Sequence, residues 1–173
     1  FVCSPNNPTA NIMDAGAIQK LCETYADTAL IIVDETYIEF SDQPSSIAKL
    51  DQFANLVVLR TLSKSHAAAG LRCGAAVARG DVTSLLQKVL APYPLAAPVM
   101  QAALTILKPE NTTKLVEKRA DIVTRRKGYA KEFAKLDDVQ SVLPSDANYL
   151  LLLVRDAADP YEKARKSGII LRD

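Results

Sequence analysis

The sequence has 173 residues, of which 49% are hydrophobic and 24% are charged, a composition typical of a globular protein of one or one and a half domains. The formal net charge of +1 argues against nucleic acid or an anionic membrane as the main partner. No apolar run approaches the length of a membrane span, so a membrane protein is not expected.

Three cysteines are spread along the chain, at Cys3, Cys22 and Cys73, without a Cys-x-x-Cys pair. An odd number at this spacing fits reduced thiols better than a disulfide framework or a zinc site. We therefore expect a cytoplasmic protein with no structural or catalytic metal.

Two buried strands are predicted in the first 40 residues, and each ends in polar side chains. Phe1–Cys3 is apolar and leads into residues 4–10, a turn rich in asparagine and proline that cannot continue a strand or a helix. Apolar side chains at helical spacing predict a helix over residues 13–26, and an apolar run over residues 29–33 predicts the second strand. It ends at Asp34, whose carboxylate is costly to bury unless it has a positive partner.

A third buried strand is predicted over residues 56–59, and it breaks into hydroxyl groups and one lysine. Thr61 and Ser63 flank Lys64, and Arg72 follows eight residues after the lysine. Ligands of open α/β sheets bind beyond the carboxyl ends of the strands. Hydroxyls and an arginine at such an end could hold a phosphate while the amine does covalent chemistry.

The remaining chain is predicted to alternate between strands and helices. Residues 73–78 form a strand that we expect to be antiparallel, because the link from Lys64 is too short for a helical crossover. The basic residues between Lys118 and Lys127 are interpreted as the solvated face of a long helix. Further helices are predicted over residues 81–90 (with Asp81 as the N-cap), 99–107, 112–136 and 160–167, and further strands over residues 139–143, 148–154 and 169–172.

Four segments resemble a known family, the fold-type I pyridoxal-phosphate (PLP) aminotransferases, and within it the histidinol-phosphate branch. The segment from Leu59 to Gly74 is similar to the family's lysine segment, and Asn7-Pro8-Thr9-Ala10 resembles its Asn-Pro-Thr-Gly motif. Asp34-Glu35-Thr36-Tyr37 and the proline-broken residues 91–99 look like the corresponding segments of that branch. Ala10 stands where the family has glycine, so a left-handed backbone there would be strained.

The resemblance implies a set of catalytic residues around PLP. Lys64 would hold the cofactor as a Schiff base and shuttle a proton, while Asp34 would face the pyridine nitrogen. Tyr37 and Asn7 would contact the phenolic oxygen. His66, two residues after the lysine, is a candidate general base, but the family carries an aromatic or apolar residue there, which favours a packing role.

The resemblance also implies residues that bind phosphate and substrate. Thr61, Ser63 and Arg72 would hold the cofactor phosphate. Arg172 lies in a segment whose arginine reaches the substrate phosphate in this branch, and a surface arginine at a strand end remains the alternative. Asn7 would also contact the substrate.

The fold class implied is α/β, comprising the C-terminal part of the PLP-dependent transferase large domain and a small α/β C-terminal domain. The large-domain part, residues 1–107, would be a mostly parallel sheet with one antiparallel strand. Residues 108–173 would be an incomplete small domain, entered by the long helix at about 112–136. The family is a homodimer, which implies a second subunit as partner.

The reaction implied is transamination between L-histidinol phosphate and 2-oxoglutarate, in which 2-oxoglutarate becomes glutamate as it accepts the amino group, as a step of histidine biosynthesis. Because the chain starts without methionine inside one apolar run and stops after another, we interpret it as part of a longer protein. Two alternatives stay open. One is a different PLP enzyme, such as an aromatic aminotransferase or a threonine-phosphate-type decarboxylase; the other is a non-catalytic truncated homologue.

Overall fold

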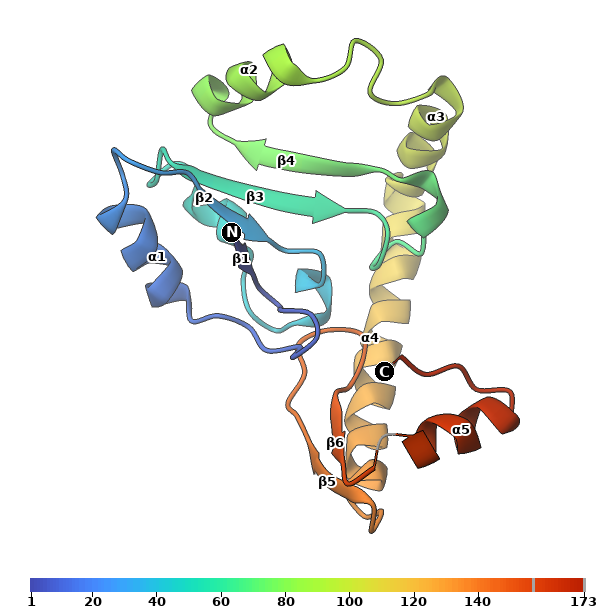
Figure 1. Ribbon diagram of the computed structural model, residues 1–173. Helices are drawn as coiled ribbons and strands as arrows, with labels where there is room; N and C mark the ends of the chain where they lie inside the picture. The colour runs from blue at the N-terminus through green and yellow to red at the C-terminus, as the bar shows by residue number, and fades with distance from the viewer. Residues whose placement is uncertain (157, 173) are drawn as a thin grey trace.

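A computed structural model describes residues 1–156 and 158–172 of the chain (Figure 1). Its main sheet has four strands in the order β1–β2–β3–β4. The first three are parallel and β4 is antiparallel to β3. This confirms the expected α/β sheet with one antiparallel strand. The strands are β1 (Val2–Cys3), β2 (Ile31–Asp34), β3 (Leu56–Thr61) and β4 (Gly74–Ala78).

Helices connect these strands and continue beyond them. Proline occupies the first turn of both α3 and α4, where its missing N–H removes no helical hydrogen bond. The α-helices are α1 (Ala15–Thr24), α2 (Gly80–Val89), α3 (Ala97–Ile106), α4 (Pro109–Phe133) and α5 (Ala158–Lys166), and the short 3₁₀ helices are η1 (Ile38–Phe40), η2 (Ser46–Lys49) and η3 (Ala69–Leu71).

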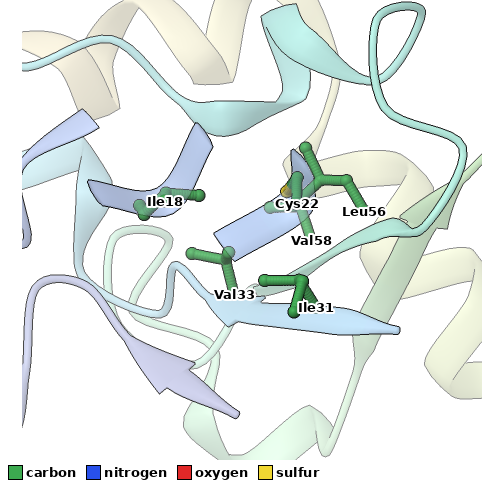
Figure 2. Close-up of a cluster of buried hydrophobic side chains, with 6 residues drawn as sticks. All are labelled: Ile18, Cys22, Ile31, Val33, Leu56 and Val58. Atoms are coloured by element: carbon green, nitrogen blue, oxygen red, sulfur yellow. The ribbon is translucent and has the colours of Figure 1, made fainter. Parts of the chain in front are cut away.

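The main core lies between α1 and the strands β2 and β3 (Figure 2). Val33, Leu56 and Val58 are completely buried there. They pack against Ile18 and Cys22 of α1, which are four residues apart and therefore on one helix face. Alternate residues of β2 and β3 thus supply the core, as the period of a strand requires.

The buried side chain of Asn55 links the end of α1 to the start of β2 through hydrogen bonds. Its Nδ2 lies 3.1 Å from each of three backbone carbonyl oxygens, those of Cys22, Tyr25 and Ala29. Because buried carbonyl groups need donors, this asparagine allows the chain to turn from helix to strand without leaving them unsatisfied.

The last quarter of the chain forms a smaller unit beyond α4 (Figure 1). Two antiparallel strands, β5 (Val139–Val142) and β6 (Leu152–Val154), make a separate sheet, and α5 follows. Figure 1 shows α4 running from the main sheet to this second sheet. No helix among the residues described is both long and apolar enough to cross a membrane.

Several predicted elements are wrong in detail. The strand expected over residues 148–154 is reduced to β6, and residues 169–172 are not a strand. Asp81 is not the cap of α2, because Arg79 holds that position and Asp81 lies in the first turn. The long helix begins and ends three residues earlier than expected. Apolar composition alone did not reveal these boundaries, since a strand or a helix also requires partners for its backbone N–H and C=O groups.

Arg126 contradicts the interpretation of the basic α4 segment as a solvated face. Its side chain is only 8% exposed, and Nη1 donates to the carbonyl oxygens of Ala147 and Phe40. Burial lowers the pKa of this guanidinium, while the charges of Asp146 and Asp42 act in the opposite direction. Arg126 therefore joins α4 to two loops beside the main sheet.

Candidate active site

The carboxyl ends of three parallel strands meet at one rim of the main sheet. Cys3 pairs with Asp34 in the register of β1 and β2, and Asp34 pairs with Leu59 in that of β2 and β3. The turn after β1 carries Asn7, and the loop after β3 carries Lys64. The predicted site residues of all three segments therefore lie along the same edge, where α/β sheets bind ligands.

Tyr37 lies at the centre of this rim. Its ring is 7% exposed, and its hydroxyl oxygen accepts a hydrogen bond from Asn7 Nδ2 at 3.2 Å. The Lys64 ammonium lies 5.7 Å from the centre of the same ring, a distance at which a cation and an aromatic face attract each other. The structure thus brings together three residues that are up to 57 positions apart in sequence (Lys64 minus Asn7).

The Asp34 carboxylate is held by the turn that follows β2. Its Oδ1 accepts hydrogen bonds from Thr36 N at 3.0 Å and from Thr36 Oγ1 at 2.6 Å. The residue is half-buried. An anion fixed in this way at a strand end is oriented before any ligand arrives.

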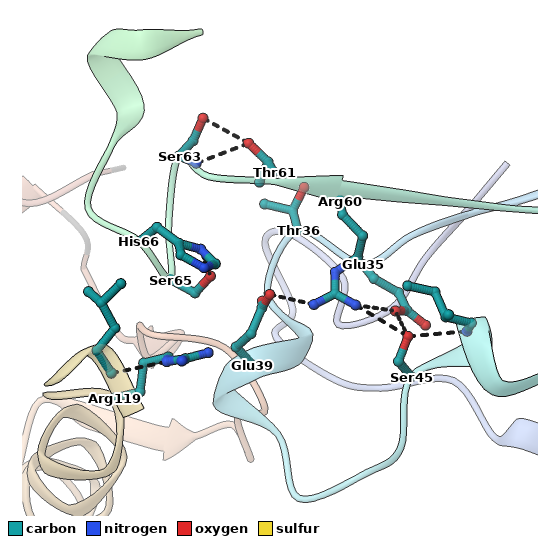
Figure 3. Close-up of polar contacts among 12 residues, drawn as sticks. Glu35, Thr36, Glu39, Ser45, Arg60, Thr61, Ser63, Ser65, His66 and Arg119 are labelled. Atoms are coloured by element: carbon teal, nitrogen blue, oxygen red, sulfur yellow. Dashed lines mark hydrogen bonds and ion pairs between the residues drawn. The ribbon is translucent and has the colours of Figure 1, made fainter. Parts of the chain in front are cut away.

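Thr61, the last residue of β3, and Ser63 form a pair of hydroxyls at the end of that strand (Figure 3). Ser63 N donates to Thr61 Oγ1 at 3.0 Å, and the two hydroxyl oxygens are 2.9 Å apart. Arg72 is exposed, with a left-handed backbone (φ 51°), and its Nη1 donates to Ala69 O at 3.0 Å. The hydroxyls are thus together, whereas the arginine bonds to its own turn.

Tyr149 is a contributor to the rim that the sequence analysis missed. Its hydroxyl donates to Asn6 O at 2.8 Å, and its ring meets that of Tyr37 edge to face at 5.4 Å. Burial raises the pKa of the Tyr149 phenol, and the nearby Arg172 charge acts against that rise. The only signal in the sequence was a polar Asn-Tyr pair inside an otherwise apolar segment.

A cavity of about 420 Å³ lies behind the lysine loop. Its wall includes His66, Arg60 and Arg119 beside the apolar Leu62 and Leu107. His66 Nδ1 is 2.9 Å from Ser65 Oγ. The imidazole therefore packs at the side of the loop, in line with the packing role expected for it.

Acidification is expected to destabilise the protein through His66, the single histidine. Burial lowers the pKa of His66 below 6.5; Glu39 opposes the shift, and Arg119 and Arg60 reinforce it. The unfolded chain then binds more protons at acidic pH, so the stabilising contribution is present above about pH 6.5 and is lost as the pH falls through the lower folded pKa. Urea unfolding of wild type and His66→Gln across this range should show a weaker pH dependence in the variant. If the free energy of unfolding of wild type and of His66→Gln depended equally on pH, the assignment of this effect to His66 would be wrong.

Backbone strain is concentrated around the site. Ala10 (φ 58°) and Ala67 (φ 53°) both adopt the left-handed conformation, which disfavours any residue with a Cβ atom. For Ala10 this confirms the strain expected from the missing glycine.

Ala67→Gly is expected to stabilise the protein by about 0.5–1 kcal/mol, because the strain disappears and the exposed methyl group contributes little packing. Ala69→Gly is the matched control, since Ala69 is exposed but starts η3 without a positive φ. Ala69→Gly should lower the free energy of unfolding by up to about 1 kcal/mol. Urea denaturation measures both, and a loss of stability in both variants would contradict the assignment of strain.

Comparison with known proteins gives a consistent match over the whole chain. The family model described as aminotransferase class I and II matches residues 1–173. Histidinol-phosphate aminotransferase 2 of Mannheimia succiniciproducens is 39% identical over all of this chain and 49% of its own length. The putative histidine biosynthesis bifunctional protein HisCD of Photorhabdus laumondii is 42% identical over all of this chain and 21% of its own length.

The fold is also shared with solved structures. The crystal structure of the histidinol-phosphate aminotransferase from Clostridium acetobutylicum superposes with a TM-score of 0.87 at 21% identity, covering 99% of this chain and 52% of that one. The present chain spans about half the length, or less, of these relatives.

Proposed function

Because the chain belongs to the class I and II aminotransferase family, we propose that the protein containing it uses PLP to transfer an amino group between L-histidinol phosphate and 2-oxoglutarate, a step of histidine biosynthesis. The observation that carries the proposal is the meeting of Lys64 and Asn7 at Tyr37. Relatives at 39% identity that are named histidinol-phosphate aminotransferases support the choice of substrate.

The residues at the rim fit PLP by their chemistry. A free amine, a fixed carboxylate and a pair of hydroxyls correspond to an aldehyde, a pyridine nitrogen and a phosphate. When bound, PLP would supply an electron sink for the carbon that loses its proton. We assign Thr61, Ser63 and Arg72 to its phosphate, with Arg72 leaving the Ala69 carbonyl to do so.

Each remaining residue has a defined task. With PLP present, the Lys64 amine would hold the cofactor covalently and would be the group that moves a proton at the substrate carbon. The Asp34 carboxylate favours a protonated ring nitrogen, because a nearby negative charge stabilises a cation. Asn7 donates to the Tyr37 oxygen, which leaves the tyrosine proton available for a ligand, and the phenolic oxygen of PLP would be its acceptor.

Arg172 is proposed to bind the substrate phosphate. Its charge acts on Tyr149, whose ring packs against Tyr37. An arginine so placed could reach an anionic group held above the same rim, and its planar fork suits a phosphate. Asn7 is proposed as a second substrate contact.

The wider organisation is also a proposal. Residues 1–107 would belong to a large domain and residues 108–173 to a small one, which is consistent with the separate sheet of β5 and β6. We propose a homodimer in the cytoplasm. Free thiols at Cys3, Cys22 and Cys73 support a reducing compartment.

Steady-state assays of the complete natural protein would test the proposal. Histidinol phosphate, phenylalanine and phosphothreonine are compared as donors or substrates at equal PLP and 2-oxoglutarate, and kcat/KM should be highest for histidinol phosphate. Turnover of phenylalanine alone, or decarboxylation of phosphothreonine, would identify a different PLP enzyme. Lack of any PLP absorption band would favour a non-catalytic protein.

A further inference from the structure

The two faces of the main sheet carry different chemistry at the rim. Side chains alternate along a strand, so Asp34 and Thr61 point to the face opposite that of their neighbours Glu35 and Arg60. Glu35 N still donates to Leu59 O at 3.0 Å, which continues the strand pairing one residue past β2. Figure 3 shows Arg60 on the other side of β3 from Thr61 and Ser63.

Four polar residues form a cluster on that reverse face, here called the reverse-face cluster: Glu35, Glu39, Ser45 and Arg60. Arg60 Nη2 pairs with Glu39 Oε1 at 2.5 Å, and Arg60 Nη1 lies 3.6 Å from Glu35 Oε2. Ser45 Oγ donates to Glu35 at 2.5 Å. One guanidinium therefore joins two carboxylates and the loop that follows η1.

Burial gives this cluster a fixed geometry. The Glu35 side chain is 2% exposed, Glu39 12% and Arg60 26%. A buried carboxylate requires partners in good geometry, and Glu35 also accepts from Ser46 N at 2.6 Å. The strand ends are thus held by charge-assisted bonds that water does not readily replace.

The cluster connects the segments that carry the reactive groups. Glu35 directly follows Asp34, and Glu39 comes two residues after Tyr37. Arg60 comes four residues before Lys64. A shift of Arg60 relative to the two glutamates would therefore move the amine relative to the carboxylate and the phenol.

We propose that the reverse-face cluster positions Lys64, fixing the strand end that carries the amine against the one that carries Asp34 and Tyr37. The inference rests on the proposed use of PLP. The hydrogen bonds and ion pairs of the cluster do not involve the Lys64 amine; the cluster acts through the backbone of β3. A misplacement of about 1 Å in a reacting group can lower the rate about 10²-fold. Loss of the reverse-face cluster should therefore have a measurable effect on the chemistry of Lys64.

The test compares variants of the complete natural protein loaded with PLP. Arg60→Met removes the central charge, Arg60→Lys keeps a charge without the fork, and Glu39→Gln is a mild change that preserves folding if Arg60→Met does not. Asp81→Asn is the control, because it removes one partner of the exposed Arg79–Asp81 pair at 3.9 Å.

Two quantities are measured for each variant: total bound PLP, and the part that borohydride fixes to Lys64, identified by mass spectrometry. The ratio of linked to unlinked PLP should fall about tenfold in Arg60→Met, equivalent to about 1.4 kcal/mol, less in Glu39→Gln, and partly recover in Arg60→Lys. The control should match wild type.

A purely structural role would lower the melting temperature or the amount of bound PLP and leave this ratio unchanged. An unchanged ratio in folded Glu39→Gln and Arg60→Lys would overturn the inference while leaving the proposed function intact. Wild type that binds no PLP would overturn the proposed function, and the inference with it.

Discussion

Replacing Lys64 with alanine is expected to abolish transamination by the complete protein, with a loss in kcat of at least about 10⁴-fold. In the proposed function, the amine at this position would have two tasks, covalent capture of the cofactor and movement of a proton. Positioned proton transfer alone contributes about 10²–10⁴-fold, and the covalent link adds to that. Single-turnover measurements with pre-bound PLP give the rate of the proton-transfer step directly.

Lys88→Ala is the matched control for this experiment. Lys88 is exposed in the last turn of α2, away from the rim, and its loss should leave kcat unchanged. A small primary amine in the buffer should restore part of the activity of Lys64→Ala, because it can accept the same proton. Wild-type turnover in Lys64→Ala would show that another residue does this work.

Arg126→Met is expected to lower the free energy of unfolding by about 3–5 kcal/mol. Hydrogen bonds from charged groups are worth about 1.5–3 kcal/mol each, and Arg126 donates to two backbone carbonyls, those of Ala147 and Phe40. Methionine fills similar space but leaves both oxygens without this donor. Urea denaturation followed by circular dichroism measures the change.

The neighbouring Arg125 offers a control with the same substitution on the same helix. Arg125 is exposed and pairs with Asp121 at 2.8 Å, four residues earlier. Exposed pairs of this kind contribute little to stability, so Arg125→Met should have little effect. Similar losses in the two variants would show that the buried hydrogen bonds of Arg126 add nothing beyond what an exposed arginine of the same helix contributes.

The parallel part of the sheet could be predicted because β2 and β3 are buried or half-buried along their length. Continuous apolar runs before Asp34 and before Arg60 marked β2 and β3, and the polar residues that follow marked their carboxyl ends. Parallel strands that end together at one rim bring Asn7, Asp34 and Lys64 together. The antiparallel direction of β4 followed from the shortness of the connection.

The contacts of Arg126 and Tyr149 could not be predicted in the same way. Both depend on loops that approach α4 or the Asn6 turn from distant parts of the sequence, and helical periodicity placed Arg126 in a run of charged residues. The irregular backbone before β6 was mistaken for a strand because its leucines are apolar. Composition records how apolar a segment is, but it does not record which backbone groups find partners.

The alternation of side chains at the ends of β2 and β3 constrains how the sequence can change in length. Deleting one residue within either strand would exchange Asp34 with Glu35, or Thr61 with Arg60, between the two sides of the sheet. After the exchange of Asp34 with Glu35, each face of the sheet would still carry one carboxylate. Neither carboxylate would then reach the hydrogen-bond partners that it has now. We therefore expect natural variants to accept insertions in the loop after η1 or before β3. We expect them to show no insertions or deletions of a single residue within β2 or β3.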